Sequence, residues 1–245
     1  MSSEAALVVD AVTAGYGGGD VLHEVSFTVP RGEVTCVVGP NGAGKSTLMA
    51  AISGLLRPSR GRVLLNGEPL TGKSPRQVLD LGIVQVPQNH SLFKEMTVRE
   101  NIDLGGYTIG DRALLARRRA SVEEMFPEVA AWSDKKAGSL SGGQQRLVEF
   151  ARCLMLDPAL IILDEPSMGL APKVLRSVFD AVEMMHAAGK TVLLVEQNAR
   201  AGLRLAGRGV VLENGRVRLT GTGREVLEHP EIGALYLGGA SGSRP

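Results

Sequence analysis

The segment GPNGAGKST, residues 39–47, decides how the rest of this sequence is interpreted. It fits the pattern G-x-x-x-x-G-K-[ST] at every fixed position. The apolar run EVTCVVG (33–39) before it predicts a buried strand, and a helical pattern from Lys45 to about Ser53 follows, closed by Gly54. Such a loop gathers backbone N–H groups at the positive end of a helix dipole, which favours phosphate. The alternative is a glycine-rich turn that holds a lysine by chance.

We therefore expect the loop to bind a nucleotide. Lys45 would reach the β- and γ-phosphates, and the Ser46 hydroxyl would ligate Mg²⁺. The candidate ATP-binding residues of the loop are Gly39, Pro40, Asn41, Gly42, Ala43, Gly44, Lys45, Ser46 and Thr47.

The run LIILDEP (160–166) predicts the second half of this site. Its apolar residues form a buried strand, so Asp164 stands at the edge of the sheet where ligands bind. There Asp164 can hold Mg²⁺, and Glu165 can orient or deprotonate an attacking water. The alternative is that both carboxylates are merely solvated.

The segment LSGGQQ (140–145) predicts a second helix start that is suited to an anion. Ser141 and Gln144 form a capping-box pattern, and an apolar helical stripe follows until Pro158. A simple capped helix explains these two residues but not the adjacent Gly142 and Gly143, which would let a backbone approach a phosphate closely.

The remaining pattern predicts an α/β fold, in which a core with a mixed sheet carries an N-terminal antiparallel β subdomain and an inserted helical subdomain. Short strands are expected over 6–29, and buried strands over 81–87 and 191–196. We assign 1–88 and 157–245 to the nucleotide-binding core and 89–156 to the helical subdomain. A helix is expected over about 172–188, tight turns at Asn66-Gly67 and Asn214-Gly215, and a frayed Gly/Ser tail over 238–243.

Composition excludes several function classes. The formal net charge of +1 over 245 residues does not indicate the strongly basic surface that nucleic-acid-binding proteins usually have. The run Arg117–Arg119 is expected to be a solvated helix face. Cys36 and Cys153 lie in apolar patterns and are expected to be buried free thiols. Neither an N-terminal signal nor an apolar stretch of about 18 residues is visible. We expect a cytosolic chain whose membrane role, if any, runs through partners.

The motifs GPNGAGKST, LSGGQ and LIILDEP, in this order and spacing, resemble the ATP-binding cassette family over nearly the whole chain. The resemblance implies a P-loop NTPase-type core, ATP and Mg²⁺ as cofactors, and two cassettes that sandwich two ATP molecules. The signature residues Ser141, Gly142, Gly143 and Gln144 would then cover the partner's ATP. Tyr16 resembles the adenine-stacking aromatic, although a strand-end tyrosine is the alternative. Gln88 resembles the glutamine that contacts Mg²⁺ and water and relays nucleotide state, although a loop glutamine is the alternative.

Three residues differ from those that are common in the family, and they indicate which subfamily the sequence resembles. Gln197 stands where most cassettes have a histidine, Ala171 where many have an aspartate, and Leu147 where an arginine is common. With DEPSMGLAP, LVEQNAR, VLENGRV and the ending ALYLGG, the sequence is similar to one cassette of branched-chain amino acid importers. Similar cassettes import urea, amides or other small solutes, so the cargo stays open. The resemblance implies Glu165, Gln88 and Gln197 as catalytic residues, and Ser46, Gln88 and Asp164 as the Mg²⁺ ligands.

The partners implied are a second, non-identical ATPase subunit, two membrane permeases and, indirectly, a solute-binding protein, with no nucleic acid. The chain would sit peripherally at the cytoplasmic face of a bacterial-type membrane. A ribosome-associated factor would carry two cassettes in one chain, and a DNA-repair ATPase would carry a long coiled coil between the motifs. Neither feature is present in this sequence.

Overall fold

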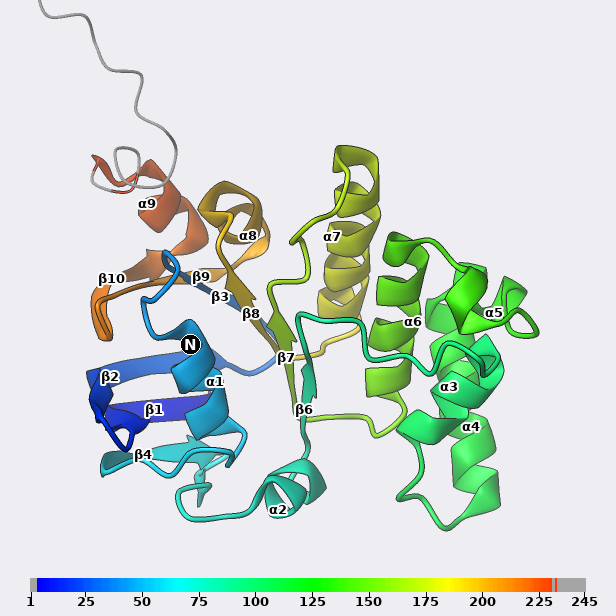
Figure 1. Cartoon of the computed structure of the whole chain (residues 1–245), viewed down its shortest axis with the longest axis horizontal. Coiled ribbons are helices and arrows are strands. Elements are labelled where there is room, and N and C mark those ends of the chain that lie inside the picture. The colour runs from blue at the N-terminus through cyan, green and yellow to red at the C-terminus, as the bar shows by residue number, and fades with distance from the viewer. Residues whose placement is uncertain (1–3, 231, 233–245) are drawn as a thin grey trace, which may run out of the picture.

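Two β-sheets and a helical lobe make up the fold in this computed structural model, which describes residues 4–230 and 232. Figure 1 shows the antiparallel sheet on one side, the mixed sheet in the middle and the helical lobe on the other side. The antiparallel sheet has the order β2-β1-β4-β5. Its strands are β1 (Ala5–Tyr16), β2 (Gly19–Pro30), β4 (Arg60–Leu65) and β5 (Glu68–Pro69).

The six-stranded mixed sheet has the order β10-β9-β3-β8-β7-β6, and the predicted phosphate loop follows its strand β3. Neighbours from β6 to β9 run parallel, and β10 alone pairs antiparallel with β9. Alternate residues of β3 enter different cores: Cys36 belongs to one hydrophobic cluster and Val37 to the other. Burial on both faces explains why these strands are continuously apolar. The strands are β3 (Val34–Val38), β6 (Ile83–Val86), β7 (Leu160–Asp164), β8 (Val192–Glu196), β9 (Arg208–Glu213) and β10 (Arg216–Thr222).

Helices cover both faces of the mixed sheet. Helix α1 contributes Leu48 and Ile52 to the core between the two sheets, whereas α6, α7 and α8 pack on the opposite face. The helices are α1 (Lys45–Ile52), α2 (Pro75–Asp80), α3 (Val98–Gly105), α4 (Arg112–Met125), α5 (Pro127–Ala131), α6 (Gly142–Leu154), α7 (Pro172–Ala187), α8 (Ala199–Leu205) and α9 (Gly223–Glu228), with a 3₁₀ turn at Ala137–Ser139.

The helical lobe, formed by α3 to α6, is continuous with the core of the mixed sheet. Phe150 and Met155 of this lobe share one buried cluster with Ile161 and Leu163 of β7. Within 89–156 the only β pairing that the structure describes is a bridge between Thr97 and Lys136. We keep 89–156 as the proposed limits of the helical subdomain.

The α/β fold class, the mixed sheet and both asparagine-glycine hairpins are confirmed. Helices α2 and α8 were not predicted, although Ser74 and Gln77 form a complete capping box before α2 that the sequence displays. Cys36 and Cys153 are buried and free, as expected. No helix among residues 4–230 and 232 is long and apolar enough to cross a membrane. The tail over 238–243 lies outside the described residues.

Candidate nucleotide-binding site

The loop after β3 leaves the start of α1 open. Gly44 is the N-cap of α1 with φ 103°, and no side chain caps the helix, so its first N–H groups remain available to an anion. A Cβ on Gly44 would lie 2.8 Å from Cδ2 of Leu22, and its left-handed backbone itself favours glycine. The predicted phosphate loop therefore has the local geometry that phosphate binding needs.

Lys45 is held inside this loop and is only 6 % exposed. Its Nζ donates to the carbonyl oxygens of Gly39 at 2.7 Å and Pro40 at 3.1 Å, and it lies 3.2 Å from Oε1 of Glu165. The ammonium is therefore placed by the backbone and neutralised by one carboxylate.

A pocket of about 430 Å³ collects most of the predicted site residues. Tyr16 does not line it; this side chain is 56 % exposed at the end of β1, where it is accessible for stacking. The signature residues lie outside the pocket too, as do Gly39, Ala43 and Asp164. Val21 and Met168 line it without having been predicted. The lining residues are Val21, Pro40, Asn41, Gly42, Gly44, Lys45, Ser46, Thr47, Gln88, Glu165, Met168 and Gln197.

Asp164 and Glu165 end β7 beside the loop. Glu165 has φ 42°, a left-handed conformation that is strained for this residue type, and its N–H donates to the carbonyl of Val195 at 2.8 Å. Burial, and then the charge of Glu165, raise the pKa of the Asp164 carboxyl. A cation between Asp164 and the exposed Ser46 would offset that cost. The described residues hold no cluster of three His, Cys, Asp or Glu ligands, but Mg²⁺ needs only one or two carboxylates beside phosphates.

Gln88 follows β6 and reaches the same carboxylate as Lys45. Its Nε2 donates to Oε2 of Glu165 at 3.3 Å and contacts Sδ of Met168 at 2.7 Å. Glu165 is thus held on one oxygen by a lysine and on the other by an amide. Gln197, just after β8, lines the same pocket as the loop.

Sequence reasoning missed Glu196, which is buried at the end of β8. Its carboxylate accepts hydrogen bonds from the Ser167 N–H at 3.1 Å and the Ser167 hydroxyl at 2.7 Å. Burial raises the pKa of Glu196, against the opposing effect of these hydrogen bonds. Glu196 therefore ties the turn after Glu165 to the segment that carries Gln197. The sequence does contain a signal for Glu196, because it is a charged residue at the end of an otherwise apolar strand.

The signature begins α6 as predicted, but its two glycines have different surroundings. Ser141 Oγ accepts from the Gln144 N–H at 3.4 Å, and Gln144 Oε1 accepts from the Ser141 N–H at 2.9 Å. A Cβ on Gly142 would meet only Nε2 of His90, at 3.5 Å. A Cβ on Gly143 would lie 2.0 Å from Cγ1 of Val174 in α7. Gly143 is therefore required by packing within the chain, whereas Gly142 leaves an open surface.

Comparison with known proteins agrees with this arrangement. A family model described as ABC transporter matches residues 22–168. The chain is 39 % identical to the high-affinity branched-chain amino acid transport ATP-binding protein BraG of Pseudomonas aeruginosa, over 95 % of this chain and all of BraG. It is 37 % identical to a probable branched-chain amino acid transport ATP-binding protein, LivF, of Archaeoglobus fulgidus, over 93 % and 96 % of the two chains.

The fold also matches a solved structure. The ADP conformation of an ATP-binding cassette of an ABC transporter superposes with a TM-score of 0.85 at 32 % identity, over 96 % of this chain and 99 % of that chain. The phosphate loop, the paired carboxylates and the capped signature helix thus occur within a matching fold and sequence. The chain therefore belongs to the ABC transporter family and is one of its ATP-hydrolysing cassettes.

Proposed function

We propose that this chain is the ATPase subunit of an importer for branched-chain amino acids and drives transport through separate membrane permeases. The observation that carries the catalytic part is the array in which Lys45 and Gln88 hold the two oxygens of Glu165 beside the phosphate loop. The cargo assignment is supported by relatives that carry this name and match almost the whole chain.

The proposed chemistry lowers the barrier by positioning and charge. ATP phosphates would take the place of Glu165 beside Lys45, because both are anions that compete for one ammonium. The released Glu165 carboxylate would then orient or deprotonate the attacking water, with Gln88 and Gln197 as its neighbours in the pocket. Mg²⁺ would be held by Ser46, Asp164 and Gln88 and would supply charge neutralisation.

A second cassette completes the site in this proposal. Ser141 and Gly142 do not line the pocket of their own chain, yet Gly142 leaves a helix start open to an approaching group. Such a surface suits the terminal phosphate of ATP that is bound by a partner. Tyr16, which is exposed at the end of β1, would stack on the adenine of the chain's own ATP.

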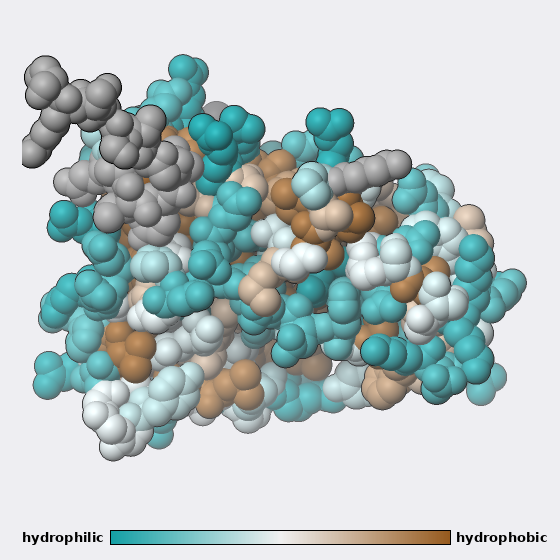
Figure 2. Space-filling model, turned by 45° about the horizontal axis from the view of Figure 1, so that its top comes forward, coloured by the Kyte–Doolittle hydropathy of each residue, from teal (hydrophilic) through white to brown (hydrophobic). Residues whose placement is uncertain are grey.

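The permeases would dock at an apolar groove between β6 and the helical lobe. This groove holds about 430 Å³ and includes Leu79, Val84 and Leu104. Phe93 and Tyr107, at 56 % and 63 % exposure, are large apolar side chains on its rim. In the view of Figure 2 the apolar surface forms separate patches within a hydrophilic surface, which suits local docking better than immersion in lipid. We place the chain peripherally at the cytoplasmic face of the membrane.

An affinity pull-down of the tagged chain from native membranes, with partners identified by mass spectrometry, tests this proposal. We expect two permeases, a second and different cassette, and a solute-binding protein whose ligand is a branched-chain amino acid. A solute-binding protein specific for urea or amides would overturn the cargo. Recovery of ribosomes, or of the chain without any membrane protein, would overturn the transport function.

A further inference from the structure

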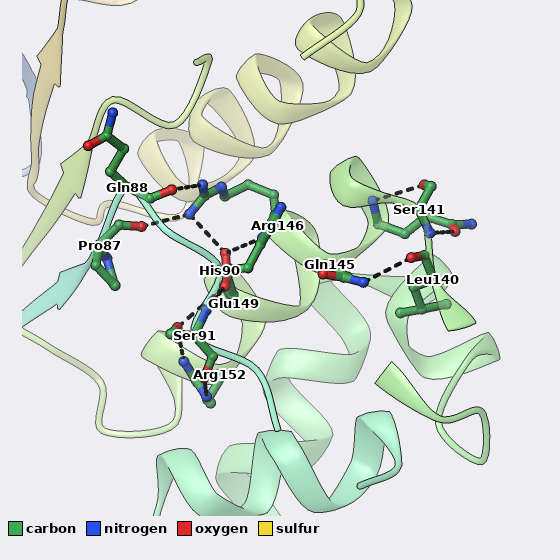
Figure 3. Close-up of polar contacts among 11 residues, drawn as sticks. Pro87, Gln88, His90, Ser91, Leu140, Ser141, Gln145, Arg146, Glu149 and Arg152 are labelled. Atoms are coloured by element: carbon green, nitrogen blue, oxygen red, sulfur yellow. Dashed lines mark hydrogen bonds and ion pairs between the residues drawn. The ribbon is translucent and has the colours of Figure 1, made fainter. Parts of the chain in front are cut away.

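A buried arginine joins the segment that carries Gln88 to the helix that carries the signature. Arg146, on α6, donates through Nη1 to the carbonyl of Pro87 at 2.8 Å and through Nη2 to the carbonyl of Gln88 at 2.6 Å. Its Nη1 also lies 2.8 Å from Oε2 of Glu149, one turn along the same helix. Figure 3 shows the guanidinium between these two carbonyls and the Glu149 carboxylate.

Glu149 secures the same segment at a second point. Its Oε1 accepts from the Ser91 N–H at 2.5 Å and from the Ser91 hydroxyl at 3.3 Å, and its Oε2 lies 3.5 Å from Nδ1 of His90. Arg152, also on α6, donates to the carbonyl of Ser91 at 3.0 Å. The chain from Pro87 to Ser91 is therefore fastened to α6 along its length.

The burial of this pair argues against a role in stability alone. Arg146 is 3 % exposed and Glu149 is 1 % exposed. The desolvation cost of such a pair offsets most of its attraction, and apolar residues of similar volume are often as stable. The Nε of Arg146 is buried without a hydrogen-bond partner, which adds to that cost. What the pair supplies is a fixed geometry between two segments.

In the proposed function both segments act on ATP. The side-chain amide of Gln88 donates to Glu165 in the pocket. Figure 3 shows that this side chain points away from Arg146, whereas the Gln88 carbonyl faces Arg146. Ser141 caps the same helix five residues before Arg146, about one and a half turns away. A displacement of the Gln88 peptide therefore acts directly on the rigid helix whose first residues form the signature.

We propose that Arg146, oriented by Glu149, is a positioning residue that makes Gln88 and the signature end of α6 move as one unit, and so links the chain's own ATP to the partner's. This inference rests on the proposed role of the signature toward a partner's ATP. It places Arg146 between the two nucleotides without contact to either.

The test uses the assembled transporter with Arg146→Lys in this chain. Lysine keeps the charge beside Glu149 but lacks the planar fork that reaches two carbonyls at once. We expect kcat for ATP to fall by about 10- to 100-fold, as for a small misplacement of a reacting group, with KM changed less than threefold. Arg119→Lys is the matched control, because Arg119 contacts both oxygens of Asp103 within the helical lobe; it should leave kcat unchanged.

A combination with Gln88→Ala separates positioning from general damage. If Arg146 acts through Gln88, Arg146→Lys should add less than twofold to the loss that Gln88→Ala causes alone. Multiplication of the two losses, or a normal kcat in Arg146→Lys, would overturn the inference.

Two further variants keep the outcomes distinct. If Arg146→Lys does not fold, the double variant R146M/E149M removes both charges and should fold, yet show the same loss of kcat; normal kcat in it would overturn the inference. Near-normal turnover in Glu165→Gln would instead refute the proposed function. A complex that Glu165→Gln inactivates but Arg146→Lys leaves intact refutes this inference alone.

Discussion

Replacing Gly143 with alanine should destabilise the chain, whereas the same change at Gly142 should not. The added Cβ at Gly143 would lie 2.0 Å from Cγ1 of Val174, so one of them must move by about 1.5 Å to reach an ordinary carbon contact. Val174 is β-branched within α7, and its side chain has one strongly preferred rotamer in a helix. Overpacking of this kind costs about 1–3 kcal/mol, offset by up to about 1 kcal/mol of helix propensity.

A net loss of about 1–2 kcal/mol, the middle of the resulting range, corresponds to a fall in melting temperature of about 2–8 °C for a chain of this size. Thermal unfolding of G142A, G143A, V174A and the double variant G143A/V174A measures it. Because alanine at position 174 removes the colliding methyl groups, the double variant should melt within about 2 °C of V174A. A Gly143→Ala chain as stable as Gly142→Ala, or a double variant with summed losses, would refute the packing argument.

Replacing Gly142 should affect activity without affecting stability. Gly142→Ala should leave stability unchanged, because its Cβ meets only Nε2 of His90 at an ordinary 3.5 Å. In the assembled complex it should lower ATP turnover by about tenfold or more, since in the proposed function the methyl group would occupy the surface that a partner's phosphate approaches. Full turnover in Gly142→Ala would mean that this glycine has no role toward a phosphate.

Three further substitutions test the pocket. Glu165→Gln should lower kcat by about 10²- to 10⁴-fold while ATP still binds, because it removes the proposed base; unchanged steady-state turnover would exclude that role. Gln197→His should raise hydrolysis at this chain's own site, measured with the partner's site disabled, because imidazole can carry a proton and an amide cannot; an equal or lower rate would contradict this. Glu196→Gln should melt at or above the temperature of the native chain at pH 7, since the raised pKa of Glu196 means that ionisation costs stability there. That advantage should vanish as the pH falls through the raised pKa and the native carboxyl becomes protonated; a variant that melts lower at pH 7 would show that the Ser167 hydrogen bonds outweigh burial.

Much of the fold followed from periodicity and turn chemistry. The buried strands around Cys36 and Leu163 are apolar because both faces of the sheet are covered. Such continuous apolar runs can be recognised in the sequence alone. The capped start of α6 was predicted from Ser141 and Gln144 and is confirmed. Helix α2 escaped prediction because it is short and buries only Val78, so it carries almost no periodic signal.

The part of the site that sequence could not supply depends on tertiary contacts. Glu196 and Ser167 meet only because two neighbouring parallel strands end at one edge of the sheet. Gly143 differs from Gly142 in being packed against Val174, which is about thirty residues downstream in the chain. Arg146 and Glu149 are polar positions in a helical pattern, and a local pattern cannot show that both are buried under the Gln88 segment.

The ion pair between Lys45 and Glu165 gives the lysine of the phosphate loop an internal counterion. An incoming phosphate must displace a tethered carboxylate, so small free anions such as inorganic phosphate or sulfate compete poorly, while ATP compensates through its other contacts. After hydrolysis the same carboxylate can return to the lysine and displace the cleaved phosphate. The pair thereby favours release of product over its retention, and it sets a threshold of binding energy that discriminates nucleotide from background anions.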